Sequence, residues 1–281
     1  MRKKTRVVHI IFLIILTVFF IECSKDEGNI IPPEIIEEPP ASGDLIFFDE
    51  FDIDGALDTS KWTFEIIPPN NGSWWNGEEQ HYTGRRDNTY ISNGTMKIVA
   101  KKEVYTFQGS TKNYTSARLN SKFSFTYGRI DVKAKLPKGG GTWPAIWTIG
   151  SNINSVGWPA CGEIDIMEHW GHEPTIVSSA THNTACSGDC SGVTVGKTAI
   201  SDYNDEFHVY SMIWNENEIQ FLIDDELKYT YDPSPKDTRN WPYSADQFII
   251  LNLAMGGSWF TIDPDFKEAA MEIDYVRVYK N

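Results

Sequence analysis

The chain has 281 residues, of which 41% are hydrophobic and 13% aromatic, so it can bury a sizeable core. Its formal net charge of −14 argues against a nucleic-acid partner, because phosphates would be repelled over most of the surface. Ten tryptophans supply flat apolar faces, which suit core packing and also stacking on sugar rings.

Residues 1–22 have the pattern of a secretory signal peptide. Four basic residues among the first six precede an almost unbroken apolar run over residues 7–21. That run, at about 15 residues, is short for a membrane span, which needs about 20. Cys23 follows directly and resembles the lipidation site of bacterial lipoproteins, although Glu22 stands where a small residue is expected. Two alternatives to a lipoprotein signal stay open: an ordinary signal peptide and a short N-terminal anchor. All three interpretations predict export of the protein, as an outer-membrane or cell-surface lipoprotein or in secreted form.

Residues 23–43 are predicted to form a flexible tether. Two Pro-Pro pairs bracket an acidic segment that is too short of apolar side chains to order itself. No internal repeat and no second linker follow, so residues 44–281 are expected to form one folded domain.

Period-two alternation and turn residues predict an all-β domain. Four stretches alternate apolar and polar residues or carry β-branched and aromatic runs: 89–102, 128–137, 207–231 and 270–280. Asn93-Gly94 and the segment Asn215–Glu218 have the composition of hairpin turns. Many short strands with regular turns favour a jelly-roll sandwich of two antiparallel sheets.

The segment GEIDIMEHWG, residues 162–171, places three acids in an apolar strand. Alternation directs Glu163 and Asp165 to one face and would leave Glu168 in the core, where burial of its charge would cost several kcal/mol. A single β-bulge at Ile166-Met167 resets the phase and returns Glu168 to the face of the other two acids. We therefore predict a bulged strand that presents three carboxyl groups in a row to the concave side of a sheet.

Paired carboxyl groups about 5–5.5 Å apart are the machinery of a retaining glycosidase. Asp165, between the two glutamates, would raise the pKa of a neighbouring carboxyl and keep a proton donor protonated near neutral pH. Two other interpretations stay open, which are a charged edge strand and a cluster that binds a divalent metal. The aromatic surroundings argue against a solvated edge.

Several motifs in sequence order resemble glycoside hydrolase family 16, and more narrowly its laminarinase-type β-1,3-glucanases. The segments WPAIW (143–147) and WPACGEIDIMEHWG (158–171) resemble the active-site region of that family. The other matching segments are FFDEFD (47–52), WNGEEQHYT (75–83), TSARLNSK (115–122), YGRIDVKAK (127–135), NLAMGGSW (252–259) and MEIDYVRVYK (271–280). The resemblance covers essentially all of residues 44–281, and it implies a β-jelly roll with a long concave substrate cleft.

The resemblance also implies catalytic roles for four residues. Glu163 would be the nucleophile, Glu168 the general acid/base and Asp165 the acid that assists the pair. His182 lies where the family often places a histidine, on the neighbouring strand beside the acid/base. Met167 would be the extra residue that separates this form from the lichenase-like members.

Further positions correspond to sugar-binding and metal-binding residues of the family. The candidate sugar contacts are Trp143, Trp147, Arg118, Asn76, Glu79 and Trp259, together with Trp74, Trp75 and Trp170 as further platforms. Arg118 would reach sugar hydroxyls or a catalytic carboxylate. A structural calcium ion would use oxygens of Glu50, Gly94 and Asp274, and no cofactor is expected for catalysis.

The cysteines that follow Cys23 are Cys161, Cys186 and Cys190, and the sequence does not decide which two of them pair. The predicted function is endo-hydrolysis of β-1,3-glucan such as laminarin, with mixed-linkage β-1,3/1,4-glucan as a further substrate. Two alternatives stay open: a galactan hydrolase of agarase or porphyranase type, and a non-catalytic glucan-binding protein on the same fold. We expect a monomer that associates with a membrane only through an N-terminal lipid anchor.

Overall fold

The structure is a computed structural model that describes residues 43–188, 190 and 194–280. Residues 41–281 form one compact unit, and the expected domain of residues 44–281 lies within it. The expected signal peptide, Cys23 and nearly all of the tether lie outside the described residues. Within the described part of the chain, no helix has the length and apolar character needed to cross a membrane.

The described chain is built on two β-sheets. The first, ten-stranded sheet contains β1 (Asp44–Asp49), β3 (Gln80–Tyr82), β4 (Thr89–Ser92), β5 (Thr95–Phe107), β6 (Ser110–Ser116), β8 (Gly128–Lys135), β13 (His208–Trp214), β14 (Ile219–Ile223), β15 (Glu226–Tyr231) and β17 (Glu268–Lys280). The second, seven-stranded sheet contains β2 (Trp62–Phe64), β7 (Arg118–Phe125), β9 (Thr142–Gly150), β10 (Glu163–His169), β11 (Ile176–His182), β12 (Val195–Ala199) and β16 (Gln247–Met255).

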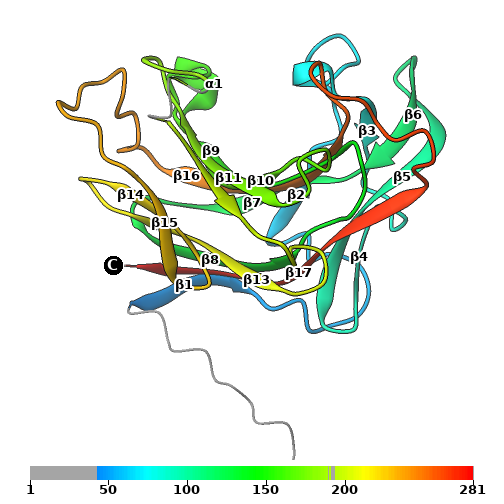
Figure 1. Ribbon diagram of the computed structural model, residues 1–281, viewed down its shortest axis with the longest axis horizontal. Coiled ribbons are helices and arrows are strands. Elements are labelled where there is room, and N and C mark those ends of the chain that lie inside the picture. The colour runs from blue at the N-terminus through cyan, green and yellow to red at the C-terminus, as the bar shows by residue number, and fades with distance from the viewer. Residues whose placement is uncertain (1–42, 189, 191–193, 281) are drawn as a thin grey trace, which may run out of the picture. The chain divides into compact units, whose positions relative to one another are not determined.

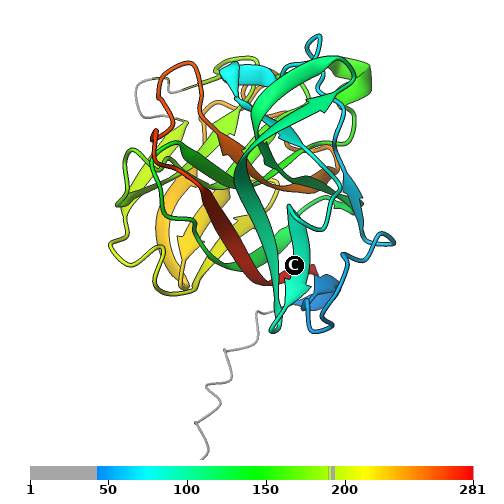
Figure 2. The same cartoon turned by 90° about the vertical axis from the view of Figure 1, so that its right-hand side faces the viewer.

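The two sheets form the layers of the predicted jelly-roll sandwich, which confirms the fold class (Figure 1). The seven-stranded sheet has the order β12-β11-β10-β9-β16-β7-β2, so β10 has a partner strand on each side. Figure 2 shows the teal β5 beside the dark-red β17, its antiparallel neighbour in the ten-stranded sheet. The central position of β10 rules out the charged edge strand.

The predicted turns are present. Asn93 and Gly94 both have positive φ, 52° and 70°, and join β4 to β5 as a tight hairpin. The N–H of Asn215 donates to the carbonyl of Glu218 at 3.1 Å, which closes the hairpin between β13 and β14. Both turns occur where polar residues interrupt the alternation of apolar side chains.

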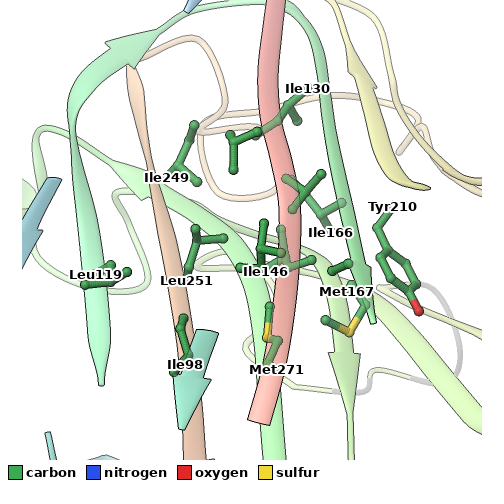
Figure 3. Packing of buried hydrophobic residues seen from close by; sticks show 14 of the residues in the cluster. Ile98, Leu119, Ile130, Ile146, Ile166, Met167, Tyr210, Ile249, Leu251 and Met271 are labelled. Atoms are coloured by element: carbon green, nitrogen blue, oxygen red, sulfur yellow. The ribbon is translucent and has the colours of Figure 1, made fainter. Parts of the chain in front are cut away.

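The core lies between the facing surfaces of the two sheets (Figure 3). Ile98, Ile130 and Met271 of the ten-stranded sheet pack in one cluster with Ile146, Ile166, Met167, Ile249 and Leu251 of the seven-stranded sheet. Because these strands bury one face in the core, their alternate residues are directed to the opposite face of the seven-stranded sheet. In the described part of the chain, two short helices lie in the loops: η1 (Trp75–Gly77) and α1 (Ile153–Val156).

Candidate active site

The acidic strand β10 contains the predicted bulge. Its register with β11 shifts between Asp165 and Glu168, and its register with β9 shifts between Asp165 and Met167. Ile166 and Met167 are 2% and 0% exposed, and both lie in the core. Two consecutive residues therefore face inward, which returns Glu168 to the face of Glu163 and Asp165.

A cleft of about 900 Å³ lies on that face of the seven-stranded sheet. The three acids of β10 lie along it, and side chains of β9, β16 and β7, with Glu65 just after β2, extend it across the sheet. The lining residues are Glu65, Pro69, Trp75, Asn76, Arg118, Asn120, Trp143, Ala145, Trp147, Ile149, Ile153, Asn154, Trp158, Glu163, Asp165, Glu168, Phe248, Ile250 and Asn252. Most of the predicted site residues therefore share one cleft, although they come from strands far apart in sequence.

His182 lies opposite Glu163 in the β10–β11 register. Its Nε2 atom is 2.9 Å from Oδ2 of Asp165 and 3.8 Å from Oε1 of Glu163. Glu168 instead faces Ser178 of the same neighbouring strand. The histidine was expected beside Glu168, and the structure places it beside Glu163 and Asp165 because the antiparallel register sets its partner.

Each of the two glutamates accepts a hydrogen bond from a tryptophan. The indole N–H of Trp158 donates to Oε2 of Glu163 at 3.0 Å, and that of Trp143 donates to Oε1 of Glu168 at 2.9 Å. Trp143 is buried, whereas Trp158 is 52% exposed at the cleft. Trp158 was not among the predicted site residues, because it lies in the loop before β10 and not on a strand whose alternation places its side chain.

Asp165 is buried and the two glutamates are partly buried beside it, and the loss of solvent raises the pKa of each carboxyl group to about 8. The charge of Asp165 further raises the pKa of both glutamates, while their indole donors and His182 lower it. Such close groups titrate as a unit, so the cluster retains protons at neutral pH. A row of carboxyl groups in this state can supply a proton donor near neutral pH.

A polar network orients Trp147 next to the acids. Its indole N–H donates to Oδ1 of Asn252 at 2.7 Å, and the guanidinium of Arg118 lies 4.7 Å from its ring centroid. Arg118 donates to Glu65 at 2.8 Å, so its charged partner is Glu65 and not a catalytic carboxylate. Asn252 and Glu65 line the cleft as well, and the sequence analysis missed both as site residues. Together, Asn252 and Glu65 provide polar groups that can form hydrogen bonds with sugar hydroxyls.

The remaining predicted sugar contacts divide between those that line the cleft, Asn76 and Trp75, and those that do not, Glu79, Trp259, Trp74 and Trp170. Asn76 lines it from η1, where a φ of 61° holds the residue in the left-handed region. Glu79 is exposed near Gly256 and does not line the cleft. Trp259 does not line it either, but it is 53% exposed and its ring centroid lies 5.3 Å from that of Trp143.

The sequence matches the family model described as "Glycosyl hydrolases family 16" over residues 76–277. The chain belongs to glycosyl hydrolase family 16. A beta-glucanase from Rhodothermus marinus is 38% identical over an alignment of 251 residues, and the match covers 84% of this chain and 85% of the relative. A keratan-sulfate endo-1,4-beta-galactosidase from Sphingobacterium multivorum is 35% identical over 246 residues, and the match covers 84% of this chain and 55% of the relative.

A family 16 structure of similar fold contains bound sugar. It is a variant of LamA from Z. galactanivorans in complex with laminaritriose and laminaritetraose, at 46% identity and a TM-score of 0.76. The match covers 84% of this chain and 99% of that chain. The identification of the family from its motifs is therefore confirmed.

The calcium position expected at Glu50, Gly94 and Asp274 offers few free side-chain ligands. Both carboxylate oxygens of Glu50 accept hydrogen bonds from Arg277 at 2.9 Å. Asp274 forms an ion pair with Lys133 at 3.1 Å, and Gly94 offers only backbone atoms. The two carboxylates therefore do not fit as free ligands of a cation, and calcium at this position stays a prediction that depends on backbone carbonyl oxygens.

The structure shows which two of the three cysteines pair. Cys186 and Cys190 form a disulfide bond, and Cys161 is a free, buried thiol directly before β10. Asn183 accepts hydrogen bonds from the N–H groups of Ala185 and Cys186, which ties the start of this loop to the end of β11. The disulfide thus lies close in sequence to His182.

Proposed function

We propose that the protein is an endo-acting hydrolase that cleaves β-1,3-glucan with retention of configuration. The observation that carries the proposal is the bulged strand β10, which presents Glu163, Asp165 and Glu168 to one cleft lined by tryptophans. A relative named as a beta-glucanase and a related structure with bound laminari-oligosaccharides support β-glucan as the substrate. An open cleft that crosses several strands suits an internal segment of a polysaccharide.

The reaction would proceed in two steps with Glu163 and Glu168 in different roles. The carboxylate of Glu163 attacks the anomeric carbon while Glu168 donates its proton to the departing glycosidic oxygen. A glycosyl ester on Glu163 results, and the new reducing end leaves. Glu168 then takes a proton from water, which attacks the same carbon and releases Glu163.

Asp165 raises and His182 lowers the pKa of both glutamates, so the assignment rests on which glutamate lies opposite His182. His182 lies opposite Glu163, 3.8 Å away, and lowers the pKa of that carboxyl, which favours the ionised form that the nucleophile needs. The charge of Asp165 raises the pKa of Glu168 and so favours the protonated form that the acid needs. Mixed-linkage β-1,3/1,4-glucan is proposed as a further substrate.

Reducing-sugar release by residues 41–281 tests the proposed substrate. The compact unit is incubated with laminarin, mixed-linkage glucan and agarose. We expect rapid release from laminarin, slower release from mixed-linkage glucan and none from agarose. Activity on agarose without activity on laminarin would contradict the proposal.

A galactan hydrolase is the second candidate, because a galactosidase relative is 35% identical to this chain. A galactan hydrolase would use the same two glutamates, so only the substrate panel separates it from a glucanase. The acidic chain favours a neutral polysaccharide over a sulfated one, since like charges repel. A glucan-binding protein would bind laminarin and release no sugar from it.

Replacing each indole donor with phenylalanine is expected to move a different limb of the pH profile of kcat/KM. Trp158→Phe removes a donor that stabilises ionised Glu163, so the acid limb shifts to higher pH by about 0.5 to 1 unit. Trp143→Phe does the same for Glu168, so the alkaline limb shifts upward by a similar amount. The pH dependence of laminarin hydrolysis measures both. Equal shifts of one limb in both variants would contradict the assignment of nucleophile and acid.

We also propose export with a lipid anchor at Cys23, which the basic start and the apolar run of the N-terminus support. Cys23→Ser is expected to move at least about nine-tenths of the protein from the membrane fraction to the soluble fraction, because one thiol carries the lipid. Immunoblots of the two fractions measure the shift, with Ser24→Ala as the matched control. A Cys23→Ser protein that stays membrane-bound would argue for a short N-terminal anchor.

A further inference from the structure

Glu163, Asp165 and His182 form a group with the composition of a metal site. One ligand atom from each side chain lies within 4.8 Å of the others, and Asp165 is buried while the other two are partly buried. Among the residues that the structure describes, no other group of three histidine, cysteine or acidic side chains meets this criterion. The group combines one imidazole with two carboxylates, a ligand set that zinc-class ions accept.

The spacing of the ligand atoms fits a small tetrahedral ion. Metal–ligand bonds of about 2.1 Å in a tetrahedron place the ligand atoms about 3.4 Å apart. Nε2 of His182 lies 2.9 Å from Asp165 and 3.8 Å from Glu163, on either side of that value. Adjustments of about half an ångström would bring both of these distances to that value, and the oxygens of Glu163 and Asp165 lie within 4.8 Å of each other. The two acids line the cleft, which leaves the fourth position open to solvent.

Asp165 provides an independent indication of a ligand. Its Oδ2 atom is buried and accepts no hydrogen bond from the described residues, even though His182 lies 2.9 Å away. The side chain is 5% exposed, and a buried carboxylate oxygen without a hydrogen bond is costly. A cation bound to that oxygen would supply the missing partner and reduce the repulsion within the row of acids.

We propose that Glu163, Asp165 and His182 bind a divalent transition-metal ion of the zinc class, and that the bound ion blocks hydrolysis. The ion would occupy the carboxylate that the glucanase mechanism uses as its nucleophile. Imidazole as a ligand and a low ligand number favour zinc over calcium or magnesium, which prefer six or more oxygen atoms. Binding is reversible, so a chelator restores activity.

Isothermal titration calorimetry with zinc and the visible spectrum with cobalt(II) test the proposal in the full mature chain, free of any substrate. The parent protein is expected to bind one equivalent of either ion, with cobalt giving the intense bands of a four-coordinate site. His182→Gln and Asp165→Asn are each expected to weaken zinc binding at least about 10-fold, since each removes one of three ligands. Circular dichroism confirms that each variant is folded. Because each variant removes a different ligand, weaker binding in both would show that the two side chains belong to the same site.

Two further variants separate this site from others. Glu168→Gln, which lacks the proposed acid and retains all three ligands, is expected to bind zinc within about threefold of the parent. His208→Gln removes a histidine that contacts Asp202 and Asp224, and it serves as the matched control with unchanged affinity. Unchanged binding in His182→Gln, or no binding by the parent, would overturn the proposal. These measurements do not depend on hydrolysis, so they stand or fall apart from the proposed function.

Discussion

Glu163→Gln and Glu168→Gln are each expected to reduce laminarin hydrolysis by at least about 1,000-fold. Glutamine retains the shape of the side chain but cannot attack the anomeric carbon or exchange a proton with the glycosidic oxygen. Both carboxyl groups are held by indole donors on one face of β10, so the fold should tolerate the amides. Reducing-sugar assays on purified variants measure the loss. Glu216→Gln, at the hairpin between β13 and β14, is the control and should remain fully active.

Azide distinguishes the two roles. With a small anion in place of the lost carboxylate, Glu163→Ala would form a glycosyl azide of inverted configuration, and Glu168→Ala one of retained configuration. The anion attacks from the face on which its cavity lies, so the product records which carboxylate was the nucleophile. NMR spectra of the glycosyl azides show the configuration at the anomeric carbon. The same configuration from both variants would contradict the proposed roles.

The same two glutamine substitutions are expected to stabilise the fold at alkaline pH, each by about 1 to 3 kcal/mol. Burial raises the pKa of each glutamate from 4.5 to about 8. Between those pH values the folded protein binds protons that the unfolded chain has released, so the free energy of unfolding falls as pH rises. An amide carries no charge and avoids this loss. The gain should be absent near pH 4 and complete above about pH 8.5.

Thermal unfolding at a series of pH values measures this effect. At pH 9 the variants should melt several degrees above the parent, since about 1 kcal/mol corresponds to about 2–4 °C for a domain of this size. Glu216→Gln should follow the parent at every pH. Glutamine variants that lose stability with rising pH as steeply as the parent would show that the buried carboxyl groups do not cause the pH dependence.

The alternation of side chains was enough to predict the bulge in β10. Ile164, Ile166 and Met167 must face the core, and an acid in the core is costly, so only a change of phase accommodates Glu168. Hairpin turns at Asn93-Gly94 and Asn215–Glu218 were predictable for a similar local reason, because their residues adopt turn conformations on their own. Local rules and motif resemblance together gave the class of fold and the acids of the site.

Contacts between distant strands were not predictable from local patterns. The indole of Trp147 meets Asn252, 105 positions further along the chain, only because β9 and β16 are neighbours. Arg118 pairs with Glu65 across 53 positions, whereas the sequence suggested sugar or a catalytic acid as its partner. The register of β11 likewise decides that His182 faces Glu163 and not Glu168. Strand order and register determine these neighbours, and neither follows from a single segment.

The central claim is that the bulged strand presents Glu163 as the nucleophile of a retaining glucanase. The most direct test is to incubate the protein with a 2-deoxy-2-fluoro laminari-oligosaccharyl fluoride, which forms the glycosyl ester quickly and hydrolyses it slowly, and to map the labelled peptide by mass spectrometry. The account predicts one sugar per chain, attached to Glu163. A label on Asp165 or Glu168, or an active protein that acquires no label, would contradict it.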